Sequence, residues 1–177
     1  MSIQIGIAPD SWGVWFSKHE KQPPWDRCLD EMQAAGYAGV ELGPWGYLPN
    51  DPAQLKKETT TSLCLDTGHH VYGGGEPIFF YRKHADRIPL LRVKDCDMVV
   101  KRKKDVQGWS FARAVAEGIM VEPGSGGIDY TALRNTLESC GYDGWVVVEQ
   151  DLFPLASFDI PFPIAKRSFQ KLKAAGF

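Results

Sequence analysis

The sequence has no long apolar run, and none approaches the roughly 20 residues that a helix needs to cross a bilayer. It also has little excess charge, because 20 lysines and arginines against 22 aspartates and glutamates leave a net charge of −2. This balance gives no reason to expect nucleic acid or an acidic membrane surface as a partner. The first residues enter a strand pattern directly, so we expect no signal peptide.

Cysteine is scarce and widely spaced. The four cysteines, at positions 28, 64, 96 and 140, form no C-x-x-C pair, so a reducing, cytoplasmic setting fits best. Cys64 and Cys140 lie in or beside apolar segments, and we expect both in the core. With 177 residues, 44% of them hydrophobic, the chain can bury the core of one domain spanning residues 1–177.

Short apolar segments alternate with helical patterns along the chain. Strands are predicted at residues 3–8, 39–43, 63–65, 89–95 and 145–149. The alternation predicts an α/β fold, with a parallel sheet and helices outside it. A weak internal repeat supports this, since Gly36-Tyr-Ala-Gly39 and Gly141-Tyr-Asp-Gly144 each precede a strand with a glutamate near its end. Repeated β/α units of this kind are typical of a (β/α) barrel.

Acidic residues stand at or near the end of every predicted strand. They are Asp10, Glu41, Asp66, Asp95 and Glu149. In (β/α) barrels the chemistry lies at the carboxyl ends of the strands, so we expect a functional site there.

The end marked by Asp66 has the richest composition. Asp66-Thr-Gly-His-His70 is followed by three glycines, and a carboxylate with two imidazoles is typical of a first-row metal site or an acid–base site. The alternative is a plain loop, in which Asp66 caps a turn and both histidines are exposed.

Tryptophans and a basic run complete the candidates. Trp12, Trp15 and Trp45 follow strand ends and are the better pocket candidates, whereas Trp25, Trp109 and Trp145 are expected in the core. The run Lys101-Arg-Lys-Lys104 is interpreted as a solvated face, with a phosphate-facing patch as the alternative.

Several stretches resemble the sugar phosphate isomerase/epimerase superfamily, the xylose isomerase-like TIM barrels. They are Leu63-Cys-Leu-Asp-Thr-Gly-His-His70, Val93-Lys-Asp95, Gly124-x-Gly126-x-x-Asp129-Tyr130 and Gly141-Tyr-Asp-Gly-Trp-Val-Val-Val-Glu-Gln-Asp151. The inosose dehydratase branch is the most similar, since its members also begin with an Ile-Gly-x-x-Pro-x-x-Trp-like segment. Here that segment is Ile5 to Trp12.

The resemblance implies an enzyme that binds one divalent metal, with Mn²⁺ or Co²⁺ first and Mg²⁺ or Zn²⁺ as further candidates. Its metal ligands here would be Asp66 and Glu149. The catalytic residues that it implies are Glu149, His69 and Lys94. The substrate-binding residues that it implies are Trp12, Glu41, His69 and Arg92. The substrate would be a sugar, polyol or inosose, and an isomerase, epimerase or dehydratase reaction would pass through an enediolate.

Two departures from the family pattern qualify this interpretation. Arg92 stands where the family has a metal-binding histidine, and a guanidinium donates hydrogen bonds but does not ligate. The fifth strand, which carries another metal glutamate, has no counterpart, and about three β/α units are missing between Glu58 and Ser62. A complete barrel takes roughly 250 residues. We therefore expect a TIM-barrel-derived, incomplete barrel of about five parallel strands.

An open barrel exposes strand edges that a closed one would pair. A homo-oligomer that covers these edges is therefore expected. Two other functions stay open from the sequence. One is a catalytically impaired remnant that acts as a binding protein. The other is a phosphodiesterase of the endonuclease IV type, which four histidines and the net charge of −2 do not favour.

Overall fold

The structure is a computed structural model that describes residues 3–16, 18–40, 64–152 and 155–177. Three predictions therefore lie outside the described residues: the role of Glu41, the pocket candidate Trp45, and the missing units between Glu58 and Ser62.

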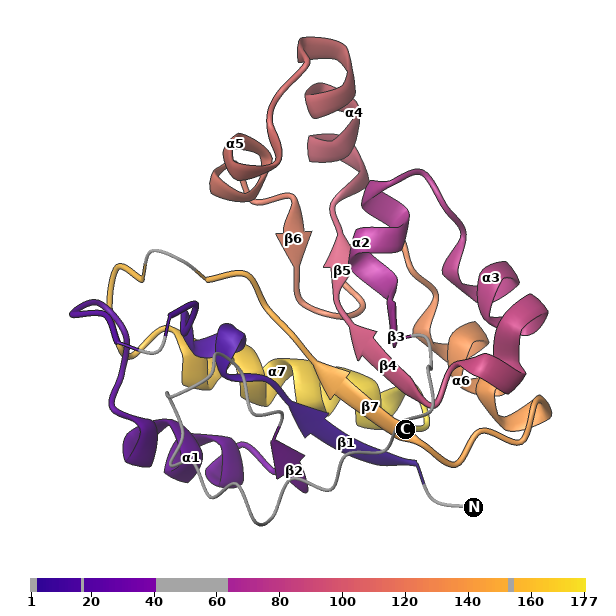
Figure 1. The fold of residues 1–177 in the computed structure, drawn as a ribbon, viewed down its shortest axis with the longest axis horizontal. Coiled ribbons are helices and arrows are strands. Elements are labelled where there is room, and N and C mark those ends of the chain that lie inside the picture. The colour runs from indigo at the N-terminus through magenta and orange to yellow at the C-terminus, as the bar shows by residue number, and fades with distance from the viewer. Residues whose placement is uncertain (1–2, 17, 41–63, 153–154) are drawn as a thin grey trace.

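Five parallel strands form the main sheet. They are β1 (Gln4–Ile7), β2 (Gly39–Val40), β3 (Cys64–Asp66), β4 (Leu90–Val93) and β7 (Trp145–Val148), in the spatial order β2-β1-β7-β4-β3. Strands that follow one another in sequence lie side by side, except β2 and β3, which do not pair in the described residues, and the last strand lies beside the first. This is the strand order of a barrel opened between β2 and β3 (Figure 1). The prediction of an incomplete barrel with five parallel strands is confirmed.

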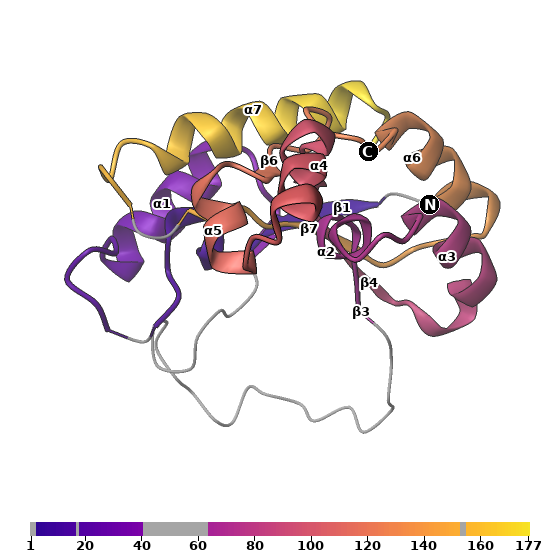
Figure 2. The same cartoon turned by 90° about the horizontal axis from the view of Figure 1, so that it is seen from above.

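Helices cover one face of this sheet. Figure 2 shows α1 (Trp25–Ala34), α6 (Tyr130–Ser139) and α7 (Pro161–Ala174) on the same side of the strands, and α3 (Pro77–His84) packs beside α6. A short 3₁₀ turn, Ala85–Arg87, follows α3. Side chains alternate between the two faces of a strand. The strand residues that share the helix-covered face are buried, namely Ile5, Ile7, Leu65, Leu91, Val93, Val146 and Val148, and Val147 on the opposite face is buried as well.

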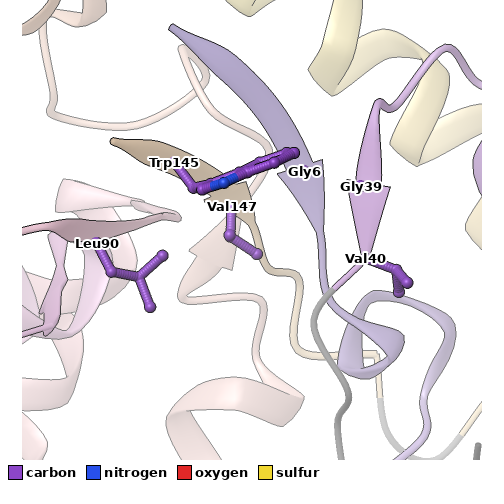
Figure 3. Close-up of a pocket in the computed structure, with 6 residues that line it drawn as sticks. All are labelled: Gly6, Gly39, Val40, Leu90, Trp145 and Val147. Atoms are coloured by element: carbon purple, nitrogen blue, oxygen red, sulfur yellow. The ribbon is translucent and has the colours of Figure 1, made fainter. Parts of the chain in front are cut away.

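The opposite face of the sheet, here called the inner face, carries the alternate residues. At its amino-terminal end a cavity of about 250 Å³ is lined by Gly6, Gly39, Val40, Leu90, Trp145 and Val147 (Figure 3). The indole of Trp145 lies over Gly39. It comes so close that a Cβ placed at Gly39 would lie 2.7 Å from its ring.

Two sequence predictions about tryptophan are corrected here. Trp145 was expected in the core, but it is 40% exposed, since helices cover only the other face of its strand. Trp25 was also expected in the core, but it is 45% exposed. Trp12 is fully buried, and its indole N–H donates to the Glu31 carboxylate over 2.6 Å. The expectation of buried Cys64 and Cys140 is also wrong, because both thiols are exposed.

A partly helical excursion extends beyond β4. It contains β5 (Asp95–Cys96), α4 (Met98–Gln107), α5 (Phe111–Ala116) and β6 (Met120–Val121), and β5 pairs with β6 antiparallel (Figure 1). The basic run lies on α4, where Lys101 and Lys104 both pair with Asp105. Among the described residues, no helix combines the length and apolar character that crossing a membrane requires.

Candidate metal and acid–base site

The Lys94 side chain lies at the centre of a cluster of charged groups. Its side chain is fully buried, and its ammonium contacts the Glu149 carboxylate. The same nitrogen lies 3.2 Å from Asp151 Oδ2, 3.6 Å from Asp66 Oδ2 and 3.1 Å from His69 Nε2. Four residues that the sequence predicted for the site, Asp66, His69, Lys94 and Glu149, therefore meet at one point.

The parallel sheet explains this convergence. Asp66 is in register with Arg92, and Val93 with Val148, so the carboxyl ends of β3, β4 and β7 lie at one edge. Side chains two residues apart share a face, which places Arg92 and Lys94 on the inner face. Glu149 follows β7 directly, and its backbone N–H donates to the Val93 carbonyl over 3.2 Å.

The Asp66-Thr-Gly-His sequence builds a short helix against Lys94. The structure forms α2 (Thr67–Tyr72) where the sequence predicted a loop, because Asp66 Oδ1 caps the helix by accepting from the His69 N–H over 2.9 Å. The Thr67 hydroxyl donates to the Lys94 carbonyl over 2.8 Å and accepts from the Lys94 N–H over 3.1 Å. Gly68 leaves room for the lysine stem, since a Cβ there would lie 2.8 Å from Lys94 Cγ.

The two histidines of this helix have different surroundings. His69 faces the cluster and is 43% exposed at its side chain, which makes it the most solvent-accessible member of the group around Lys94. His70 instead packs against the ring of Phe80, at 4.7 Å between ring centroids. Helical geometry turns adjacent side chains to different directions, so only one imidazole serves the site.

Opposing effects set the charges in the cluster. Burial alone would lower the pKa of Lys94, but attraction to Asp66, Glu149 and Asp151 outweighs burial, so the pKa is raised and the ammonium persists at neutral pH. Burial raises the pKa of Asp151, although Lys94 opposes that shift. Arg92 adds a second cation, with Nη1 3.1 Å from Glu149 Oε2. Two cations therefore face three carboxylates.

The donor atoms also fit a divalent ion. Asp66, His69 and Glu149 each offer one ligand atom, and these atoms lie within 4.8 Å of one another. Asp66 Oδ2 and Glu149 Oε2 are buried and lack a hydrogen-bond partner within the described structure, although both lie near a cation. Carboxylate and imidazole donors suit Mn²⁺, Co²⁺, Mg²⁺ and Zn²⁺ in varying degree.

Of the other acidic residues near strand ends, Asp95 lies outside the Lys94 cluster and Asp151 belongs to it. The Asp95 carboxylate is buried and accepts backbone N–H groups of Gly124, Gly126 and Ile128, so it fixes the loop before α6 instead of facing the cluster. Asp151 belongs to the cluster but was not among the predicted site residues. The signal was present in Glu149-Gln-Asp151, where two acids follow one strand. The proposed substrate contacts of Trp12 and Arg92 stay predictions.

Comparison with known proteins identifies the family of this chain. Residues 58–174 match the xylose isomerase-like TIM barrel family. The chain belongs to this family. Among curated relatives, it is 32% identical to an inosose dehydratase of Lacticaseibacillus casei over 169 residues, which are 88% of this chain and 56% of that protein. It is 28% identical to the inosose dehydratase of Geobacillus thermodenitrificans, over 82% of this chain and 53% of that protein.

Other relatives are matched over shorter lengths. The rhizopine catabolism protein MocC of Rhizobium meliloti is 37% identical over 65% of this chain and 36% of its own length. Among solved structures, the zinc-bound IolI protein aligns with a TM-score of 0.46 at 20% identity, over 66% of this chain and 38% of that chain. The chain thus spans about half, or less, of the length of these curated family members.

Proposed function

We propose that this chain carries the active-site groups of a divalent-metal-dependent enzyme that isomerises, epimerises or dehydrates a sugar, polyol or inosose. The observation that carries the proposal is the group of ligand atoms from Asp66, His69 and Glu149, within 4.8 Å of one another. The similarity to inosose dehydratases supports the substrate class. Mn²⁺ or Co²⁺ is the proposed ion.

In this proposal Asp66 and Glu149 would hold the ion, and His69 beside them would not bind it. When bound, it would polarise a substrate carbonyl and the neighbouring hydroxyl, which acidifies the adjacent C–H bond. His69 is the cluster member that solvent reaches most easily, and it would accept the proton from that carbon. The electron pair of the C–H bond then forms the enediolate, whose developing negative charge Lys94 and Arg92 would stabilise.

The product depends on where the proton returns. Delivery from His69 to the neighbouring carbon gives an isomer, and delivery to the original carbon by a second acid on the other face gives an epimer. Delivery to a departing hydroxyl releases water and completes a dehydration. The same imidazole can take up the proton and then return it, because a neutral imidazole nitrogen accepts a hydrogen bond or proton and the protonated ring donates from both nitrogens.

The alternative is a remnant that binds but does not turn over. One observation favours it: Lys94 and Arg92 already neutralise much of the carboxylate charge, with Nζ and Nη1 in contact with the two oxygens of Glu149. Such a protein would bind a polyhydroxylated ligand through these groups without needing a metal.

Calorimetric titration with Mn²⁺ separates the two functions. We expect the unmodified protein to bind Mn²⁺, and D66N and E149Q to bind at least about tenfold more weakly because each loses an anionic ligand. E117Q, at an exposed position at the end of α5, is the matched control and should bind like the unmodified protein. Conversion of an inosose by the Mn²⁺-loaded protein would support the enzyme. No Mn²⁺ binding at millimolar concentration would contradict it.

A further inference from the structure

Contacts from α2 hold Lys94 in place along both its backbone and its side chain. Three successive residues of α2 act on it: Thr67 bonds its backbone N–H and C=O, Gly68 leaves space for its stem, and His69 meets its ammonium. The buried Tyr130 hydroxyl also donates to the Lys94 carbonyl over 3.1 Å. The Asp66-Thr-Gly-His sequence therefore fixes the position of one particular cation.

That cation lies among the same groups that fit a metal. The Lys94 ammonium contacts Asp66, His69 and Glu149, the three residues whose ligand atoms cluster within 4.8 Å. An ammonium and a divalent ion at the same carboxylates would repel each other strongly in a buried site, where the effective dielectric constant is low. The two cations therefore exclude each other from close contact with this group.

We propose that Lys94 and a divalent ion are alternative occupants of this carboxylate site, so that the withdrawal of Lys94 sets the affinity for metal. This inference rests on the proposed function, and it assigns Lys94 a regulating position in addition to its proposed role toward substrate. Asp151 offers the Lys94 ammonium a second carboxylate to pair with. It lies 3.2 Å from Lys94 Nζ, outside the group of three ligand residues, and can retain the ammonium when the metal enters.

The test compares Mn²⁺ affinity with and without the Lys94 charge. K94M keeps an unbranched stem of similar length beside Gly68 and removes the ammonium. We expect K94M to bind Mn²⁺ at least about tenfold more tightly than the unmodified protein, because one nearby positive charge is gone. Calorimetry measures the affinity, and Mn²⁺ should raise the melting temperature of K94M more than that of the unmodified protein.

Two further variants make the test decisive. K94M leaves three carboxylates close together and can fail to fold, whereas K94M/D151N also removes one carboxylate outside the ligand group and should still bind Mn²⁺ more tightly than the unmodified protein. K103M, at an exposed position on α4, is the matched control and should leave the affinity unchanged.

The outcomes separate this inference from the proposed function. Equal or weaker binding by the Lys94 variants, with binding by the unmodified protein, overturns the inference and leaves the proposed function standing. Binding by the Lys94 variants alone supports the inference and contradicts a metal-dependent function for the natural chain. No binding by any of them overturns both.

Discussion

The two ends of the inner face differ in how completely this chain pairs their polar groups and covers their apolar side chains. At the carboxyl end, the Lys94 cluster pairs charges from the ends of β3, β4 and β7, and its central side chain is fully buried. At the amino end, the Trp145 cavity is lined by apolar side chains and glycines, and the indole remains 40% exposed. Both regions would face the interior of a closed barrel.

The difference shows which part of a barrel survives opening. Every partner of Lys94 in the cluster comes from strands that are neighbours in the sheet or from segments that follow them directly, so the site needs no strand from the far side. The apolar end has no such local partner, since in a barrel its residues pack in layers contributed by strands around the whole circle. A polar site can therefore persist where an apolar interior does not.

Removing the Glu149 carboxylate should lower the free energy of unfolding more than any other change considered for these two regions. In E149A, Lys94 and Arg92 lose the acid that contacts both of them, and we expect the free energy of unfolding to fall by about 3 kcal/mol, since a buried ion group would be broken. Urea denaturation measures the change, with E117A as the exposed control. A loss no larger than that of E117A would mean that water, and not the chain, stabilises the cluster.

The sequence predicted the cluster better than its surroundings. Asp66 and Glu149 could be expected to meet because parallel strands bring their carboxyl ends to one edge, and this depends only on strand identity. Asp151 could not be placed in the same way, because it lies beyond the strand and its position depends on the path of the loop. The helix after Asp66 was missed because Thr67-Gly68 favours a turn, whereas capping by Asp66 and packing against Lys94 favour helix.

The tryptophans show the limit of prediction from composition. Trp145-Val-Val-Val148 is entirely apolar, a pattern typical of strands covered on both faces. Trp145 was therefore expected in the core. The strand order shows an open sheet in the described part of the chain, which leaves one face of β7 without helices. Whether a strand residue is buried depends on whether the sheet closes into a barrel, and the local sequence of one strand does not show this.

A second substitution should disturb only the apolar, amino-terminal end of the inner face. In G39A, the new methyl group would meet the Trp145 ring at 2.7 Å and push the indole outward. Because the ring is already partly exposed, we expect a cost near the low end for overpacking, about 1 kcal/mol, with a red shift of tryptophan emission. G73A, where a Cβ would meet no atom closer than 3.5 Å, is the matched control. Mn²⁺ affinity should not change in G39A, and a change would show that the two ends are coupled.

The smallest effect is expected where water reaches the charges. Burial alone would raise the pKa of Glu122, but hydrogen bonds and attraction from Arg167 and Lys171 lower it below its ordinary value of 4.5. The ionised carboxylate therefore stabilises the fold above that pH, and the contribution is lost as the pH falls through the lowered pKa. We expect E122Q to cost about 0.5 kcal/mol at neutral pH, as is usual for exposed ion pairs, and nothing once Glu122 is protonated.

Salt distinguishes this exposed group from the Lys94 cluster. Because Arg167 is half-exposed, molar sodium chloride should screen its pairing with Glu122 and reduce the effect of E122Q. The effect of E149A should persist under the same conditions, since the Lys94 side chain is inaccessible to solvent. Urea denaturation of both variants at low and high salt measures the two differences. Equal salt sensitivity would mean that the carboxyl end of the inner face is as open to water as the surface pair, and the contrast between the two ends of the sheet would then have to rest on packing alone.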